Sequence, residues 1–188
     1  MEKQLVPFSK FLSLILRHQP ETIGLSLDEQ GWADVQQLLN LAQQEGTPLS
    51  QDLLETIVAT NDKQRFAFNH DKTKIRASQG HSSDVNLQLT PQSPPQQLFH
   101  GTATRFMDSI RQQGLLPLKR QYVHLSADAH TALKVGQRHG QPLILTIQAQ
   151  AMYQNGFNFY YSANQIWLTT SVPCGYIEFP PVSNGDRP

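Results

Sequence analysis

Residues 65–76 read Arg-Phe-Ala-Phe-Asn-His-Asp-Lys-Thr-Lys-Ile-Arg, and this stretch decides the fold of the first half of the chain. Alternation with a period of two places Phe66 and Phe68 on one face of a strand and Arg65 on the other. The polar run 69–72 is typical of a turn, after which residues 74–76 can return as the partner strand. The sequence therefore predicts a β-hairpin, on which Arg65 is by default an ordinary residue of a solvated face.

Amphipathic helices are predicted on the N-terminal side of this hairpin. The first ends near residues 17–18, because Pro20 disfavours helical geometry in the residue before it. A third begins after Ser50, which is a suitable N-cap. Between them, a second helix is predicted from an apolar set at helical spacing: Trp32, Val35, Leu38, Leu39 and Ala42. Three helices followed by a hairpin is the order of a winged-helix module.

Composition and pattern change after the hairpin. Residues 78–97 are rich in Ser, Gly and Pro and are predicted to form a linker, with one short strand over 85–89. Beyond the linker we expect strands at 98–102, 122–126, 143–147, 166–168 and 176–179, and helices at 105–113 and 128–138. The predicted fold class is α+β, with an N-terminal lobe over 1–77, the linker over 78–97 and a mixed α/β lobe over 98–188.

Charge and composition exclude several classes of function. Lys and Arg number 15, as do Asp and Glu, so the net charge is zero and a polybasic mode of nucleic-acid binding is disfavoured. Residues 1–77 carry a net charge of −2 and residues 78–188 carry +2, which favours the second half for an anionic ligand. The only cysteine, Cys174, excludes an intrachain disulfide and a cysteine zinc cage.

The sequence also carries expectations about location, assembly and metals. The histidines lack the spacing of zinc ligands, and no apolar run reaches the ~18–20 residues that a membrane span needs. The N-terminus lacks the apolar segment of a secretory signal. We therefore expect a cytoplasmic monomer without a metal site and without a membrane partner.

Several short polar motifs are candidates for binding an anion. Arg17 and His18 end the first helix, where cations also simply complement the helix dipole. The tripeptide His100-Gly101-Thr102 follows a strand, and its glycine would let a ligand approach the backbone closely, while its neighbours offer hydrogen bonds. Strand alternation over 120–126 places four side chains on one face, either as a solvated face or as the wall of a cleft: Arg120, Tyr122, His124 and Ser126.

In their order and spacing these motifs resemble the RNA 2′-phosphotransferase (KptA) family, also called tRNA 2′-phosphotransferase. The resemblance runs from residue 9 to about residue 179. It is carried by residues 9–18, 31–32, 63–66, 99–102, 123–126, 138–140, 166–169 and 172–173.

The resemblance implies a winged-helix-like lobe that binds RNA and an ADP-ribosyltransferase-like lobe that binds NAD. In the implied reaction, an internal RNA 2′-phosphate of the tRNA splice-junction type attacks C1″ of the nicotinamide riboside and expels nicotinamide. The ribose O2″ of the resulting 2′-phospho-ADP-ribosyl RNA then attacks the phosphodiester, which yields 2′-OH RNA and ADP-ribose 1″,2″-cyclic phosphate. The implied catalytic residues are Arg17, His18, Arg65 and Arg120, and the implied NAD-binding residues are His100, Gly101, Thr102, His124 and Ser126.

The residue types fit this chemistry. A phosphate is already an anion at neutral pH and needs no general base, in keeping with the lack of any Glu between His100 and Glu178. The second step builds charge on phosphorus, and guanidinium groups match phosphoryl oxygens in charge and shape. His18 is a candidate to protonate the departing RNA oxygen.

Two other functions are weighed against this one. A winged-helix nucleic-acid binder with a regulatory ligand domain needs a basic recognition helix, but residues 51–60 contain Asp52 and Glu55 and no Lys or Arg. An ADP-ribosyltransferase that caps terminal phosphates of RNA or DNA would keep the same fold, and this alternative stays open. A protein acceptor is disfavoured by the missing Glu.

Overall fold

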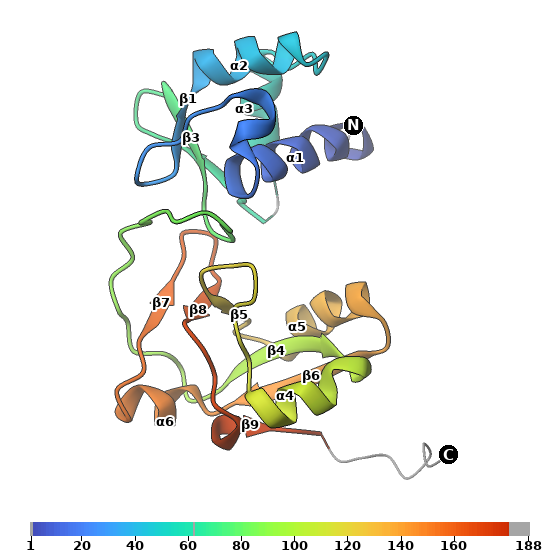
Figure 1. Cartoon of the computed structure of the whole chain (residues 1–188), viewed down its shortest axis with the longest axis vertical. Helices are drawn as coiled ribbons and strands as arrows, with labels where there is room; N and C mark the ends of the chain where they lie inside the picture. The colour runs from blue at the N-terminus through green and yellow to red at the C-terminus, as the bar shows by residue number, and fades with distance from the viewer. Residues whose placement is uncertain (1, 62, 181–188) are drawn as a thin grey trace. The chain divides into compact units, whose positions relative to one another are not determined.

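The chain folds into two compact units (Figure 1). The computed structural model describes residues 2–61 and 63–180. The first unit runs to Leu89 and includes two short later segments, Lys119–Gln121 and Ser162–Asn164, while the second contains Thr90–Leu118, Tyr122–Tyr161 and the residues from Gln165 onward. The structure thus groups residues 78–89 and these two segments with the first unit, unlike the boundaries at 77 and 97 expected from sequence. Among the described residues, no helix is long and apolar enough to cross a membrane.

In the first unit, helices surround a small antiparallel sheet. The helices are α1 (Glu2–Arg17), α2 (Val35–Gln44) and α3 (Gln51–Ala59), with a 3-10 turn at Pro20–Ile23. The sheet has the order β1-β3-β2, from β1 (Trp32–Asp34), β2 (Phe66–Phe68) and β3 (Lys74–Ala77). The expected hairpin is confirmed, because β2 and β3 are antiparallel partners in which Phe68 faces Ile75.

Local sequence signals explain where these helices begin and end. α1 ends at Arg17, as the proline that follows predicts, and its Leu12 and Ile15 are fully buried. The Ser50 hydroxyl accepts a hydrogen bond from the backbone N–H of Leu53 at 3.2 Å, so the expected N-cap of α3 is confirmed. The helix that carries Arg17 is therefore anchored in the core of the first unit.

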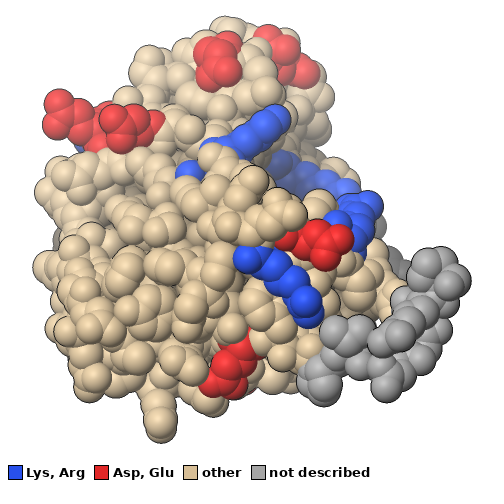
Figure 2. All heavy atoms as spheres, turned by 60° about the horizontal axis from the view of Figure 1, so that its bottom comes forward, with Lys and Arg blue, Asp and Glu red and all other residues tan. Residues whose placement is uncertain are grey.

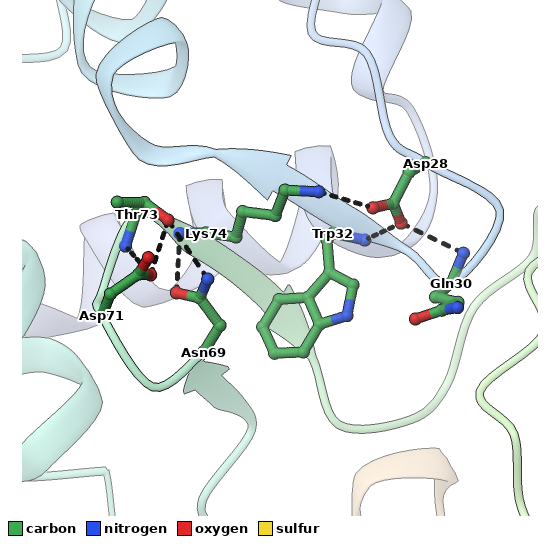
Figure 3. A network of polar contacts seen from close by, with 7 residues as sticks. All are labelled: Asp28, Gln30, Trp32, Asn69, Asp71, Thr73 and Lys74. Atoms are coloured by element: carbon green, nitrogen blue, oxygen red, sulfur yellow. Dashed lines mark hydrogen bonds and ion pairs between the residues drawn. The ribbon is translucent and has the colours of Figure 1, made fainter.

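Trp32 was expected in the second helix, and this prediction is wrong. Trp32 begins β1, which pairs along its length with β3. The Asp28 carboxylate fixes the entry to this strand by accepting the backbone N–H groups of Gln30 and Trp32 at 3.1 and 2.9 Å, and it pairs with Lys74 at 3.1 Å (Figure 3). The helix α2 begins only after Asp34, whose carboxylate caps it. A cross-strand partner distant in sequence thus overrides the helical spacing of Trp32.

Residues 78–89 were expected to be part of a linker with a strand over 85–89, and the structure contradicts both points. No strand forms over 85–89, and Ser78, His81 and Val85 are buried, with His81 only 1% exposed. The backbone N–H of Ser82 donates to the carbonyl of Arg17 at 2.9 Å. The segment is held by backbone hydrogen bonds to distant residues, which its Gly- and Ser-rich composition does not reveal.

The second unit contains two antiparallel three-stranded sheets. One has the order β4-β6-β9, from β4 (Leu98–Ala103), β6 (Pro142–Ile147) and β9 (Ile177–Glu178). The other has the order β5-β8-β7, from β5 (Val123–Leu125), β8 (Trp167–Thr169) and β7 (Phe159–Tyr161). The sheets meet where the backbones of Phe99 and Ser126 exchange hydrogen bonds of 2.8 and 2.9 Å. The expected strands of this half are confirmed, although β5 is shorter than predicted, and β7 was not predicted.

The helices of the second unit follow the sequence signals closely. α4 (Met107–Gln113) follows a 3-10 turn at Thr104–Phe106 and ends at Gly114. α5 (Ala129–Gly136) is capped by Asp128 and continues as a 3-10 turn over Gln137–His139, whereas α6 (Ala149–Gln154) was not predicted. A further 3-10 turn, Cys174–Tyr176, precedes β9. α5 packs against β4 and β6 (Figure 1).

Candidate functional site

The first unit gathers the four residues expected to be catalytic. Arg17 and His18 lie at the end of α1, Arg65 directly precedes β2, and Arg120 lies in the segment 119–121. The guanidinium of Arg17 donates to the backbone carbonyl of Arg65 at 3.4 Å. We call these four residues the arginine-histidine cluster.

Arg17 is the partly buried centre of this cluster. Its pKa is lowered to about 10, first by burial and then by the positive charges of Arg65 and Arg120. Its Nε is buried and has no hydrogen-bond partner. Each of these features disfavours the charged guanidinium, and an anion bound among the arginines would offset all of them. The pKa of Arg120 is also lowered by burial. The arrangement suits a multiply charged anion such as a phosphate.

Neighbouring groups hold the arginines in place. The Arg17 guanidinium lies 5.9 Å from the centre of the Phe66 ring. Gly80, at φ +89°, lies beside it, so that a Cβ there would stand 3.6 Å from the Arg17 Nη1. The side-chain oxygen of Asn61 accepts a hydrogen bond from Arg65 Nη1 at 3.3 Å. The cluster is therefore a constrained arrangement rather than a set of free surface side chains.

His18 is exposed, and its Nδ1 lies 3.1 Å from the hydroxyl of Ser82. Its pKa is lowered from the usual 6.5 by burial and then by the charges of Arg17 and Arg120. Both causes favour the neutral ring over the imidazolium. An anion that neutralises the two arginines would raise this pKa and favour the imidazolium, which can donate a proton.

Arg120 was expected on one strand face with His124, and this placement is wrong. β5 begins only at Val123, and residues 119–121 belong to the first unit. The backbone N–H of Gln121 donates to the carbonyl of His81 at 3.3 Å, and its side-chain amide donates to the carbonyl of Val85 at 3.0 Å. These bonds hold residues 119–121 in the first unit, so that Arg120 lies near Arg17 and is not part of β5.

Sequence reasoning missed Ser82, His81 and Gln121, which surround the arginine-histidine cluster. Ser82 and His81 lie in a Gly- and Ser-rich stretch, and Gln121 lies in a polar loop, so that none has a periodic or spacing signal. A lone histidine between glycine and serine was the one available hint that residues 78–89 are packed. His81 is buried beside Arg17, and its two ring nitrogens have no hydrogen-bond partner.

The second unit gathers the five residues expected to bind NAD. His100, Gly101 and Thr102 lie in β4, His124 lies in β5, and Ser126 follows it. His100 Nδ1 is 3.0 Å from the backbone carbonyl of His124, and Thr102 and Ser126 are buried. Burial lowers the pKa of His100, opposed by its hydrogen bond to the His124 carbonyl. The group contains no Lys, Arg, Asp or Glu side chain, and burial favours the neutral ring of His100, so we call it the neutral site.

Gly101 was expected to admit a ligand to the backbone, but the structure gives it a different partner. A Cβ at Gly101 would overlap the carbonyl oxygen of Ala132, in α5. Reciprocally, a Cβ at Gly136 of the same helix would lie 2.6 Å from the carbonyl oxygen of Thr102. The two glycines let α5 pack directly on the backbone of β4. Gly101 therefore positions its neighbours His100 and Thr102.

A pocket of about 560 Å³ lies beside Arg65 in the first unit. Its size falls within the range of small-molecule sites. Asn61, which binds Arg65, is part of its wall, and Ala163 comes from the segment 162–164. The lining residues are Val58, Ala59, Thr60, Asn61, Gln64, Phe66, Ala67, Ser78 and Ala163.

Charged side chains are dispersed over the face of the molecule drawn in Figure 2. On the face drawn in Figure 2, Lys and Arg side chains form separate groups with Asp and Glu among them, and most atoms belong to uncharged residues. Within the residues that the structure describes, no group of three or more His, Cys, Asp or Glu side chains could hold a metal ion. The arginine-histidine cluster is thus a local concentration of charge in a chain of zero net charge.

Comparison with known proteins gives a consistent result. Residues 3–171 match the model of the family described as RNA 2'-phosphotransferase, Tpt1 / KptA family. A probable RNA 2'-phosphotransferase of Hahella chejuensis is 60% identical over 178 residues, covering 94% of this chain and 95% of that protein. Proteins with the same description from Flavobacterium johnsoniae and Escherichia coli O9:H4 are 57% and 51% identical, covering 91% and 95% of this chain and 94% and 97% of their own lengths. The family resemblance noted in the sequence is thereby confirmed, and the chain belongs to the Tpt1 / KptA family of RNA 2'-phosphotransferases.

Proposed function

We propose that this protein removes an internal 2′-phosphate from RNA, of the kind left at a tRNA splice junction, and that it consumes NAD in doing so. The observation that carries the proposal is the clustering of three arginines around the partly buried Arg17, whose pKa is lowered to about 10 by burial and by the charges of Arg65 and Arg120. Such a cluster is costly without an anion and becomes favourable when a phosphate is bound. In this proposal the first unit is a winged-helix-like RNA-binding lobe and the second is an ADP-ribosyltransferase-like lobe.

The arginine-histidine cluster would bind the RNA 2′-phosphate. Guanidinium groups of Arg17, Arg65 and Arg120 would contact its oxygens and stabilise the charge that develops on phosphorus. No general base is needed at the start, since the phosphate is already anionic. When the bond from phosphorus to the RNA O2′ breaks, the Nε2–H of His18 would donate its proton to that oxygen.

The neutral group in the second unit is the proposed site of NAD. NAD supplies the electrophilic ribose carbon that accepts the phosphate, with nicotinamide as the leaving group. The hydrogen-bonding groups of this site, which has no Lys, Arg, Asp or Glu side chain, fit ribose hydroxyls and amides better than phosphates, and they come from His100, Thr102, His124 and Ser126. Gly101 supports this group through its contact with α5.

The test uses an oligoribonucleotide with one internal 2′-phosphate, incubated with and without NAD and analysed by mass spectrometry. We expect the RNA to lose its phosphate only with NAD, with release of nicotinamide, and we expect EDTA to have no effect. Release of inorganic phosphate without NAD would refute the proposal. A second oligonucleotide with a terminal 5′-phosphate and no 2′-phosphate tests the alternative, because its ADP-ribosylation as the preferred reaction would identify a capping enzyme.

A further inference from the structure

We propose that Ser82 and Gln121 are positioning residues of the arginine-histidine cluster. Ser82 ties down Nδ1 of His18, so that Nε2 is the ring nitrogen presented to a bound phosphate, and Gln121 fixes the segment that carries Arg120. The kinetic consequences rest on the proposed function, but the orientation of His18 is a property of the protein without ligand.

Ser82 is bonded to both members of the cluster that α1 provides. Its backbone N–H donates to the Arg17 carbonyl at 2.9 Å, and its hydroxyl lies 3.4 Å from the same oxygen and 3.1 Å from His18 Nδ1. Because that carbonyl is the last of the helix, it has no partner within α1. Ser82 therefore caps the end of α1 and holds the histidine that follows.

The single proton of the Ser82 hydroxyl can point either to the Arg17 carbonyl or to His18 Nδ1, and we assign it to the carbonyl. A hydroxyl has one proton and two lone pairs, and a carbonyl oxygen only accepts. When the hydroxyl proton points to the Arg17 carbonyl, a lone pair faces Nδ1, which must then carry a hydrogen. The neutral ring has its free lone pair on Nε2, and the imidazolium keeps the same bond from Nδ1. His18 can thus gain and lose a proton at Nε2 without any rotation of Ser82.

Gln121 performs the equivalent task for Arg120. Its backbone N–H and its side-chain amide are both used, on the carbonyls of His81 and Val85, and the amide also lies 3.5 Å from an Asp84 oxygen. Gln121 is thus hydrogen-bonded through both its backbone and its side chain to residues 81–85, which leaves its side chain little rotational freedom. Arg120 is the residue directly before it, so the position of its backbone is set by these bonds.

The tautomer is tested by ¹⁵N NMR of the histidine ring nitrogens in the full chain without ligand, at pH 7.5. His18→Gln assigns the His18 signals. We expect the wild-type ring to carry its hydrogen on Nδ1, and Ser82→Ala to shift it largely to Nε2, the tautomer that free imidazole side chains prefer. Ser82→Thr keeps the hydroxyl and should restore the wild-type pattern.

Ser83→Ala is the matched control. The Ser83 hydroxyl is buried and has no hydrogen-bond partner, so that its removal should leave the His18 signals unchanged. Equal tautomer populations in wild type and Ser82→Ala would overturn the assignment to Ser82. This outcome would leave the proposed function intact, because it concerns only the orientation of the ring.

Kinetic measurements test whether Ser82 positions His18 and whether Gln121 positions Arg120. We expect Ser82→Ala to lower kcat about tenfold with the KM for NAD unchanged, since misorienting a catalytic group mainly affects the transition state. Gln121→Met keeps the size of the side chain but removes its amide donors, and should raise the KM for 2′-phosphorylated RNA about fivefold. A rise in the KM for NAD alone, or wild-type kinetics in both variants, would overturn the proposal.

Discussion

The two units each hold a group of candidate residues, and the two groups use their polar side chains in opposite ways. In the first unit, burial and the positive charges of Arg65 and Arg120 lower the pKa of Arg17 to about 10. In the second unit, His100 bonds to a backbone carbonyl, and Gly101 lets α5 lie directly on β4. One group concentrates positive charge, whereas the other has no Lys, Arg, Asp or Glu side chain and is packed against α5.

This difference teaches how a chain of zero net charge can handle a phosphate. The protein does not need a broad basic surface, because a few cations in a partly buried cluster act through a lower effective dielectric than surface cations do. Rigid neutral groups are better suited to recognising hydroxyls and amides, whose hydrogen bonds depend on direction. The following predictions test the division from the largest expected effect to the smallest.

The largest effect is expected from removing a guanidinium of the arginine-histidine cluster. Arg120→Ala should slow the reaction by ~10²–10³, or ~2.7–4 kcal/mol, the usual loss for one preorganised donor. Arg65→Ala should behave in the same way. The loss should fall on the step that builds charge on phosphorus, so that RNA heavier than substrate by one ADP-ribosyl group accumulates. Lys variants should recover little, because an ammonium cannot make a bidentate contact. A time course measures both effects when mass spectrometry separates the substrate, the heavier RNA and the 2′-OH product.

Ser126→Ala is the matched change in the neutral site. It should raise the KM for NAD without accumulation of the heavier RNA.

If both arginine variants keep the wild-type rate and are shown by circular dichroism to be folded, the catalytic assignment is wrong. If the arginine variants leave the substrate unreacted and no heavier RNA accumulates, the arginines serve substrate binding or the first step instead.

The second prediction concerns the rigidity of the neutral site. Gly101→Ala should destabilise the protein by roughly 3 kcal/mol, because the new methyl group would overlap the Ala132 carbonyl and force α5 away from β4. Urea unfolding of the full chain measures the loss. Gly175→Ala is the control, since a Cβ there would have no heavy atom within 4 Å, and it should change stability little. Equal stability of the two variants would show that α5 does not constrain β4.

The sequence predicted well the features that depend on neighbouring residues. The cap at Ser50, the stop before Pro20 and the alternation around Phe66 are all local, and the helices and hairpin that they predict are confirmed. The location of Trp32 depends instead on its pairing with β3, which lies more than 40 residues away in sequence. Helical spacing alone cannot reveal such a partner.

The candidate site shows the same limit. The family resemblance singled out Arg17, His18, Arg65 and Arg120, but their gathering depends on residues 78–89 packing as part of the first unit. That packing rests on backbone hydrogen bonds such as Ser82 to Arg17 and Gln121 to His81, which leave no trace in composition. Strand alternation therefore assigned Arg120 to the wrong element.

A third prediction concerns the interior behind the arginine-histidine cluster. Burial and the charges of Arg17, His18 and Arg76 lower the pKa of His81 to about 4, against 6.5 when unfolded. The unfolded chain therefore takes up the proton first as the pH falls, and stability is lost below pH 6.5 until about pH 4. His81 should account for about 2 kcal/mol of the loss between pH 7.5 and pH 5. Urea unfolding at the two pH values measures the free energy of unfolding. Between pH 7.5 and pH 5, His81→Leu should lose about 2 kcal/mol less of it than the wild type does.

The control for this prediction is His70→Gln, which changes an exposed histidine of the hairpin turn. It should keep the wild-type pH dependence. A His81→Leu variant that loses as much stability in acid as wild type would place the acid sensitivity elsewhere, for example in paired carboxylates.

The smallest expected effect concerns the pocket beside Arg65. Ala163 is exposed and lines this pocket, so Ala163→Leu should narrow it without disturbing a core. In the proposed complex, a nucleoside next to the 2′-phosphate would lie near the arginines, and stacking of a base on a protein side chain is worth ~1–3 kcal/mol. If the pocket holds the flanking nucleoside, partial filling should raise the KM for a 2′-phosphorylated oligonucleotide about fivefold. The KM for a nucleoside 2′-phosphate, which has no flanking residue, should stay unchanged.

Gln43→Leu, on the exposed face of α2, controls for an added surface leucine. A raised KM for NAD would instead assign the pocket to the dinucleotide, and would weaken the separation of charged and neutral recognition between the two units.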